Sequence, residues 1–199
     1  VPAEWSNCAD EGLDYPKATE GLDETLAFVN NIQTAVSAQE GNNLPVSAFT
    51  TYVDGTTPSG TSAYEKRGIA VHVPVWNNEN CIQCGFCAYV CPHAVIRTIA
   101  LTEDEANNAP EGMPTLAMNG MPGYKFAISV SQLDCTGCGS CANVCPGKKG
   151  EKALTMQNFE ANVDKQAWFN YTNKLPEKPE VIAKFKETTV KGSQFKKPL

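Results

Sequence analysis

The sequence predicts an α+β fold of short β-hairpins and short helices, arranged as two equivalent halves about a pseudo-twofold axis. Two observations in the 199-residue chain lead to this prediction. One cysteine pattern, C-x2-C-x2-C-x3-C-P, occurs twice, and apolar segments with the alternation of β-strands precede and follow each copy. Each half should therefore contain a strand, a cysteine-rich loop, a short helix and a second strand, with both halves packed around one core.

The two cysteine runs predict the cofactor. They hold eight of the nine cysteines: Cys81, Cys84, Cys87 and Cys91 before Pro92, and Cys135, Cys138, Cys141 and Cys145 before Pro146. The same spacing occurs in bacterial ferredoxins with two 4Fe-4S clusters, where three cysteines of each run ligate one cluster and the fourth ligates the other. We therefore predict a bacterial ferredoxin-like fold with two 4Fe-4S clusters. The expected ligands are Cys81, Cys84, Cys87 and Cys145 for cluster A, and Cys135, Cys138, Cys141 and Cys91 for cluster B.

Disulfide bonds and zinc are the alternative uses of these cysteines. Secreted disulfide scaffolds are short and rich in cysteine throughout, whereas these cysteines are confined to two runs. Zinc sites pair C-x2-C motifs across a longer loop, and a third cysteine two residues further on has no place in a tetrahedral site. Both alternatives are therefore disfavoured. A protein that bound zinc and lacked visible charge-transfer absorption would contradict the cluster prediction.

Charge and hydropathy disfavour two classes of partner. The net charge is −6; residues 1–40 carry eight acids and one lysine, and residues 158–199 carry eight lysines and five acids. Because the lysines near the end are interspersed with acids and prolines, no basic stripe predicts nucleic-acid binding. No apolar run reaches the length of a membrane span, and the first residues lack a basic signal-peptide region. Cluster-binding thiolates also require a reducing compartment, so we expect a cytoplasmic protein of an organism that lives with little oxygen.

The first 80 residues are expected to form two regions. Residues 1–40 make an N-terminal segment with one amphipathic helix over residues 22–39, where apolar residues recur at helical spacing. Residues 41–80 make an irregular linker region, rich in turn residues, that carries the YEKRG motif at residues 64–68. A strand over residues 69–76 should then deliver the chain into the first cysteine run. The residues expected on one face of this strand are Ile69, Val71, Val73 and Val75.

The ferredoxin-like domain is expected over residues 81–159. Its predicted strands lie at residues 95–101, 124–130 and 153–159. Residues 102–123, rich in acids, Asn, Pro and Gly, predict an insertion that loops over the surface. Met113, Met118 and Met121 in this insertion form either an adaptable contact patch or, as we favour, a set of gap-filling side chains against a neighbouring domain.

Residues 160–199 are expected to form a C-terminal extension. The aromatic side chains of Trp168, Phe169 and Tyr171 should pack, whereas residues 187–199 are expected to be poorly ordered on their own. Cys8, far from either run, is predicted to be a plain thiol and not a ligand.

Residues around the cysteines can be interpreted in two ways, as part of the cluster sites or as ordinary structural residues. Small residues in the loops either let backbone amides approach the sulfurs or relieve turn strain; they are Gly85, Gly137, Gly139 and Ser140. Six apolar residues either form a shell that keeps water from the clusters or belong to an ordinary small core. They are Ile82, Phe86, Val90, Val95, Ile128 and Val144.

Two further sets of residues have the same ambiguity. His93, two residues after Cys91, either relays to a cluster or, as we favour, serves as a surface or capping histidine. Lys148, Lys149 and Lys152 either steer an acidic carrier protein or form a solvated cluster of lysines.

Longer motifs make the chain resemble a specific family. Besides the runs themselves, they include Pro45-Val46-Ser47-Ala48-Phe49, Asp54-Gly55-Thr56, Tyr64-Glu65-Lys66-Arg67-Gly68-Ile69-Ala70-Val71, Trp76, Glu79-Asn80, Pro92-His93-Ala94-Val95-Ile96-Arg97, Asp134 and Val190-Lys191-Gly192-Ser193-Gln194-Phe195. In this order and spacing, they resemble the middle region of pyruvate:ferredoxin oxidoreductases, and the resemblance covers nearly the whole chain. The chain looks like the linker plus the two-cluster domain of that enzyme.

The resemblance implies an electron-transfer role. Enzymes of this family oxidatively decarboxylate pyruvate and pass electrons through three 4Fe-4S clusters to ferredoxin or flavodoxin. Thiamine diphosphate, Mg and the third cluster are expected only in domains that this chain lacks, and the resemblance implies a homodimeric parent enzyme. No residue is assigned a catalytic role. A free-standing two-cluster ferredoxin, or an electron-transfer subunit of another 2-oxoacid oxidoreductase, is the alternative.

Overall fold

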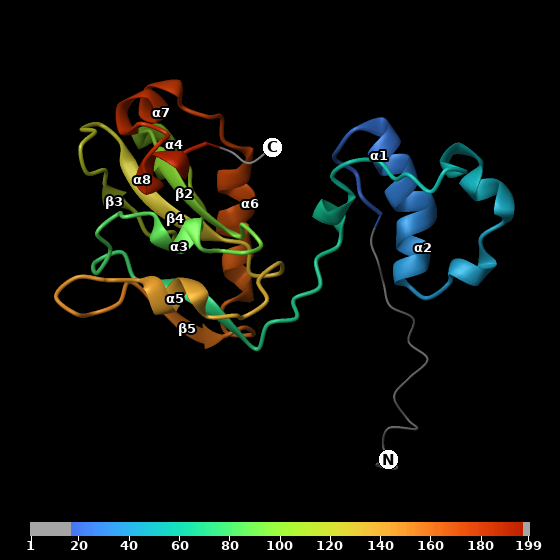
Figure 1. Cartoon of the computed structure of the whole chain (residues 1–199), viewed down its shortest axis with the longest axis horizontal. Helices are drawn as coiled ribbons and strands as arrows, with labels where there is room; N and C mark the ends of the chain where they lie inside the picture. The colour runs from blue at the N-terminus through green and yellow to red at the C-terminus, as the bar shows by residue number, and fades with distance from the viewer. Residues whose placement is uncertain (1–16, 197–199) are drawn as a thin grey trace, which may run out of the picture. The chain divides into compact units, whose positions relative to one another are not determined.

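The computed structural model describes residues 17–196, so Trp5, Cys8 and Tyr15 lie outside the described residues. The chain divides into two compact units, with the boundary between Lys66 and Arg67 (Figure 1). Each unit is described by itself. The predicted domain boundaries at residues 40, 80 and 159 stay a prediction.

The first unit is built on the predicted N-terminal helix. α1 (Asp23–Phe28), a π-helical turn (Val29–Gln33) and α2 (Thr34–Ser37) follow one another without a break. Helical spacing correctly predicts this element, but only part of its apolar stripe is covered. Val29 and Ile32 are buried, whereas Leu22 and Val36 are exposed.

The linker region folds back along this helix. It contains short 3-10 turns at Gly41–Asn43, Val46–Tyr52 and Thr61–Tyr64. The Gln33 side chain donates to the carbonyl oxygen of Thr61 (3.2 Å), and the ring of Phe28 packs edge-on against Tyr52 (5.0 Å between centroids). Residues 41–66 therefore form part of a compact unit and are not an extended connector.

The second unit contains two small antiparallel sheets. β1 (His72–Trp76) pairs with β5 (Leu154–Asn158). β2 (Ile96–Leu101) pairs with β4 (Lys125–Val130), and β4 also pairs with β3 (Leu116–Ala117). The strand before each cysteine run thus pairs with the strand after the other run. The prediction of a mixed helix and strand fold is confirmed.

The strand before the first cysteine run is shorter than predicted, and its buried face is different. It begins at His72, and Ile69 and Val71 are 66% and 72% exposed. Val73, Pro74 and Trp76 are buried instead. The prediction of one apolar face from Ile69 to Val75 was wrong because pairing with β5 starts only at His72, opposite Asn158.

The insertion at residues 102–123 is also more ordered than predicted. It contains α4 (Glu103–Asn107) and β3, which adds a third strand to the sheet of β2 and β4. α4 starts with a capping box: the Glu105 amide donates to Thr102 Oγ1, and the Thr102 amide donates to the Glu105 carboxylate. Met118 is buried in the core, and Met113 and Met121 pack against it, so the methionines fill gaps within their own unit and not, as predicted, against a neighbouring domain.

The C-terminal extension packs on the same unit. It consists of a 3-10 turn (Val163–Lys165), α6 (Gln166–Lys174), α7 (Pro179–Phe185) and α8 (Val190–Ser193). Thr172 on α6 donates to the hydroxyl of Ser129 on β4 (2.8 Å), and Phe195 packs edge-on against Phe126 (6.4 Å). The expectation that residues 187–199 are poorly ordered was therefore wrong for residues 187–196, which are held by the core.

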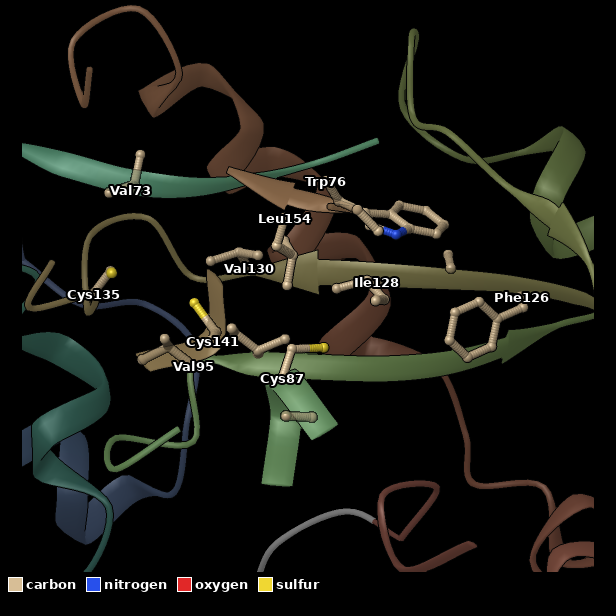
Figure 2. Packing of buried hydrophobic residues seen from close by; sticks show 14 of the residues in the cluster. Val73, Trp76, Cys87, Val95, Phe126, Ile128, Val130, Cys135, Cys141 and Leu154 are labelled. Atoms are coloured by element: carbon tan, nitrogen blue, oxygen red, sulfur yellow. The ribbon is translucent and has the colours of Figure 1, made fainter. Parts of the chain in front are cut away.

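The core of the second unit lies between the two sheets and the helices of the cysteine runs, α3 (Phe86–Tyr89) and α5 (Ser140–Val144). Figure 2 shows Val95, Ile128, Val130 and Leu154 in the same cluster as Cys87 and Cys141. In the described part of the chain, no helix has the length and apolar character needed to cross a bilayer.

Candidate iron–sulfur sites

The eight run cysteines line two separate cavities. One is lined by Cys81, Cys84, Cys87 and Cys145. The other is lined by Cys135, Cys138, Cys141 and Cys91. In each cavity, three cysteines come from one run and the fourth comes from the other run.

The remaining walls of the two cavities come from equivalent positions of the two halves. Pro92, Val95 and Ile96 line the second cavity, and Pro146, Ala153 and Leu154 line the first. In each case the proline directly follows the crossing cysteine, and the two apolar residues lie where the next strand begins. The strand that leaves one cysteine run therefore helps to enclose the cavity to which that run sends its fourth cysteine.

The two cysteine loops share an unusual backbone. Gln83 and Gly137, each two residues after the first cysteine of its run, have positive φ angles of 59° and 71°. This conformation turns the backbone amide back onto the preceding sulfur: the Gln83 amide donates to Cys81 Sγ (3.4 Å), and the Gly137 amide donates to Cys135 Sγ (3.3 Å). Such N–H···S bonds stabilise a thiolate and are one of the features that set cluster potentials.

A second left-handed residue starts each helix. Gly85 and Gly139, directly after the second cysteine of each run, have φ angles of 79° and 75° and cap α3 and α5. Left-handed backbone is readily adopted only by glycine, so turn geometry is one reason for these glycines. Gly85 has a second reason, because an added Cβ would come 3.3 Å from the Cα atom of Lys191 on α8.

Burial raises the pKa of Cys81, Cys87, Cys135 and Cys141 above the ordinary thiol value, in the case of Cys141 to about 11. Cys138 is exposed, and hydrogen bonds from Ser140 lower its pKa. Iron must therefore displace a proton from each of the buried thiols, and iron–thiolate bonds supply the free energy for this step.

The donor set fits an iron–sulfur cubane better than a single metal ion. Four thiolates around one zinc ion, with Zn–S bonds of about 2.3 Å, would lie about 3.8 Å apart. Within residues 17–196, no three His, Cys, Asp or Glu side chains are grouped closely enough to hold one ion. All-cysteine cavities with wider spacing are what a cluster of four irons and four sulfides requires.

The expected apolar shell is only partly closed. Val95 and Ile128 are buried, and Val90 is half-buried. Ile82, Phe86 and Val144 are 45%, 43% and 38% exposed. Ile82 nevertheless lines the first cavity, whereas Phe86 and Val144 are not among the residues that line either cavity. The prediction of a shielding role is thus wrong for Phe86 and Val144.

The remaining candidates lie near the surface. His93 is exposed and lines the second cavity. Lys148 and Lys149 are exposed in the loop that follows the second cysteine run. Lys152 Nζ instead donates to the carbonyl oxygens of Ala142 (2.5 Å) and Asn143 (3.1 Å), so it caps the C-terminal end of α5. Three lysines that look alike in sequence thus have two different roles in the structure.

Sequence reasoning missed one residue in the first cysteine loop. Gln83 is only 3% exposed; its Nε2 donates to the carbonyl oxygen of Ala117 (2.7 Å), and its Oε1 accepts from the amide of Asn119 (2.8 Å). The loop is thereby fixed to the insertion that carries β3. The equivalent position of the second run is Gly137, and this difference between two otherwise similar loops was the available signal.

Comparisons with known proteins agree with this arrangement. Residues 16–70 match a domain of unknown function, and residues 80–149 match a 4Fe-4S dicluster domain. The chain is 44% identical to a pyruvate-flavodoxin oxidoreductase of Enterobacter agglomerans over 199 residues, and 45% identical to a pyruvate:ferredoxin oxidoreductase of Moorella thermoacetica over 201 residues. It is 47% identical over 178 residues, 86% of this chain, to a pyruvate dehydrogenase (NADP+) of Cryptosporidium parvum.

These alignments cover only a part of each relative. The first two cover 100% of this chain and 16% of the relative, and the third covers 9% of the relative. The chain therefore spans about one sixth of the length of the first two relatives. It contains a 4Fe-4S dicluster domain and, with it, the sites of two 4Fe-4S clusters. The predicted resemblance is confirmed: this chain is homologous, along its whole length, to one segment of the pyruvate:ferredoxin and pyruvate-flavodoxin oxidoreductases.

Proposed function

We propose that this chain is the electron-transfer module of a pyruvate:ferredoxin oxidoreductase, which conducts electrons from the oxidative decarboxylation of pyruvate to ferredoxin or flavodoxin. The observation that carries the proposal is the pair of four-cysteine cavities that share one apolar core. When bound, a 4Fe-4S cluster takes up and releases one electron at a time. No residue of the module is required to make or break a bond of the substrate.

The ligand assignment is part of this proposal. Cys81, Cys84, Cys87 and Cys145 would hold cluster A, and Cys135, Cys138, Cys141 and Cys91 would hold cluster B. The lining of the two cavities supports this assignment. The equivalent loop conformations and the exchanged pairing of strands support a pseudo-twofold, ferredoxin-like arrangement of residues 81–159, with a C-terminal extension packed on it.

The side chains between the two cavities keep water out. Cys87 and Cys141, one from each cysteine set, are 5% and 7% exposed and interact electrostatically with each other. Val95 and Ile128 are buried in the same cluster (Figure 2). The two cavities are thus adjacent and separated by apolar packing, which is the arrangement needed for transfer between two centres without access of bulk water.

The partners and the setting are inferred from the relatives. The names of the relatives specify flavodoxin or ferredoxin as the linked carrier. We assign thiamine diphosphate, Mg and a third 4Fe-4S cluster to other domains of the parent enzyme, which we infer to be a homodimer in the cytoplasm. The domain of unknown function, residues 16–70, would be the linker of that enzyme.

Reconstitution of the full chain with iron and sulfide tests the function. We expect four iron atoms per cluster and two clusters per chain, with spin-coupled electron paramagnetic resonance signals after reduction. The reduced protein should transfer electrons to ferredoxin or flavodoxin in stopped-flow measurements. A chain that takes up zinc, or that holds a single cluster, would refute the proposal.

The intact mass of the natural polypeptide tests the setting. A polypeptide several times heavier than 21.5 kDa places these residues inside a fused oxidoreductase. A natural polypeptide of about this mass would instead show a free-standing ferredoxin or a separate electron-transfer subunit.

A further inference from the structure

Two half-buried cations of the described residues, Arg97 on β2 and Lys191 on α8, form no ion pair with a carboxylate there. Lys165 is also half-buried without an ion pair, but its ammonium group donates to Asn162 Oδ1 and lies over the Trp168 ring. Other lysines do have carboxylate partners, among them Lys125 with Glu103, Lys178 with Glu105, and Lys196 with Glu187. Removing an unpaired charge from water costs free energy, so such a group is normally paired with an anion.

Arg97 lies next to the second cavity. Its neighbours Val95 and Ile96 line this cavity, together with Cys91 from the end of the preceding run. The Nε–H group of Arg97 is buried and has no hydrogen-bond partner within the described residues. A buried donor without an acceptor is rare, and it indicates a ligand or an ion that would complete the site.

Lys191 lies next to the first cavity. Its Cα atom would come 3.3 Å from a Cβ atom at Gly85, which lines that cavity, so α8 lies directly against the first cysteine loop. Figure 1 shows α8 next to α3, the helix that follows Gly85. Lys191 Nζ donates to the carbonyl oxygen of Asn119 (3.2 Å) and lies 4.3 Å from the centre of the Phe185 ring. Both contacts hold the ammonium group without neutralising it.

Each of the two cations interacts electrostatically with a cysteine of a different cavity. Burial lowers the pKa of Arg97 and of Lys191 from their ordinary values. The negative charge of Cys91 opposes this effect at Arg97, and that of Cys81 opposes it at Lys191. Cys91 belongs to the second cavity and Cys81 to the first. Arg97 on β2 is thus coupled to the second cavity, and Lys191 on α8 is coupled to the first.

We propose that Lys191 and Arg97 are the fixed counter-charges of the two clusters, Lys191 for cluster A and Arg97 for cluster B, and that each raises the reduction potential of its own cluster. A cubane held by four thiolates carries net negative charge, which increases on reduction. A nearby cation stabilises the more negative, reduced state, and protein interior weakens solvent screening of this attraction. This inference rests on the proposed function, since it requires both clusters to be bound.

The inference also explains two features of the C-terminal extension. The Val190-Lys191-Gly192 stretch brings a cation to the first cysteine loop, which lies more than 100 residues earlier in the chain. Gln83 and Lys191 both bind the backbone of Asn119: the Asn119 amide donates to Gln83 Oε1, and Lys191 Nζ donates to the Asn119 carbonyl oxygen. The insertion therefore joins the first cysteine loop to the residue that supplies its positive charge.

Redox titration of four variants of the reconstituted full chain tests the proposal. Lys191→Met and Arg97→Met remove the charges, and Lys191→Arg and Arg97→Lys retain them. Lys184→Met, on the exposed face of α7, is the matched control for removal of a lysine. Electron paramagnetic resonance follows each cluster during the titration, and iron content verifies that both clusters are present.

We expect Lys191→Met and Arg97→Met each to lower the potential of a different cluster. An effect of about tenfold on the ratio of reduced to oxidised cluster at a fixed potential corresponds to about 59 mV for one electron. The charge-retaining variants and Lys184→Met should leave both potentials close to those of the unaltered chain. Two bound clusters with unchanged potentials in both Met variants would overturn the counter-charge proposal alone, whereas an unaltered chain without two clusters would overturn the proposed function.

Discussion

At the scale of single residues, Cys145 belongs to the second run in sequence and to the first cavity in space. The same holds in reverse for Cys91. Both follow a short helix that ends within the run, so each crosses to the opposite half before its proline turns the chain away. Each cluster site therefore requires both halves of the domain to be folded.

Cys145→Ala should damage cluster A more than cluster B. The reason is that Cys145 lines the cavity of Cys81, Cys84 and Cys87, so its removal leaves that site with three thiolates. Iron content and electron paramagnetic resonance of the reduced protein measure the outcome. Cys138→Ala is the matched control and should affect the other cluster. Selective loss of the cluster held by Cys135, Cys138 and Cys141 in Cys145→Ala would refute the crossover.

Gln83→Ala should destabilise the reconstituted protein by about 1–3 kcal/mol, since it removes the two hydrogen bonds that the buried Gln83 side chain makes with the Ala117 carbonyl and the Asn119 amide. Gln157→Ala is the control, because Gln157 is an exposed glutamine on β5. Thermal unfolding, followed by loss of the cluster absorption, compares the two variants. Equal transition temperatures would show that the buried amide of Gln83 does not hold the loop.

At the scale of elements, the C-terminal extension is part of the cluster-binding unit. α8 is capped at its N-terminus by Thr189, whose side chain accepts from the amide of Gly192 (3.1 Å). Gly192 is buried against the end of α7, where the carbonyl oxygens of Phe185 and Lys186 approach it. A short helix of this kind has little stability of its own and depends on such packing.

Gly192→Ala should displace α8. An added Cβ would lie 2.2 Å from the carbonyl oxygen of Lys186 and 2.3 Å from that of Phe185, and both are backbone atoms that cannot rotate away. We expect a cost of about 1–3 kcal/mol and faster tryptic cleavage within residues 184–196. Gly41→Ala is the control, because the atom nearest to its added Cβ is a side-chain atom 3.4 Å away. Tryptic cleavage within residues 184–196 should be unaffected in this variant. Unchanged cleavage in Gly192→Ala would mean that α8 is not docked as described.

At the scale of the whole molecule, the lysines that follow the second cysteine run are the candidate contact for an acidic carrier protein. Lys148 and Lys149 lie in an exposed loop that directly follows Cys145, one of the residues lining the first cavity. The ammonium group of Lys152 instead donates to carbonyl oxygens at the end of α5, so it is less available to a partner than Lys148 and Lys149 are. We therefore expect this loop to steer an acidic carrier through two lysines and not three.

The double variant Lys148→Glu, Lys149→Glu should slow the reduction of an acidic carrier protein at low salt, because like charges reduce the rate of encounter. The difference from the unaltered chain should shrink as ionic strength rises and shortens the Debye length. Stopped-flow kinetics over a series of salt concentrations measure it, with Lys184→Glu on α7 as the control. A rate that does not change at low salt would remove this loop from the path of the carrier.

Much of the molecule could be predicted from the sequence, because local signals specify it. The 22–39 helix follows from apolar spacing, β2, β4 and β5 follow from alternation, and the cofactor follows from cysteine spacing. The exposed positions of Ile69, Val71 and Phe86 did not follow, since an apolar residue next to a strand or a cysteine looks the same whether or not a neighbour covers it. The order within residues 102–123 and 187–196 was missed for a related reason: both segments are polar and short, and their contacts come from distant parts of the chain.

The sequence by itself determined the type of cofactor and the eight cysteines proposed as its ligands, because thiolate type and spacing are covalent properties of the chain. Only the tertiary structure decided what surrounds those residues. The placement of Gln83, Arg97 and Lys191 around the cavities depends on pairings between segments up to about a hundred residues apart, which no local pattern records. Burial is a property of the folded assembly of all these segments. It makes an ordinary arginine and an ordinary lysine into charges that can set the potential of a cluster.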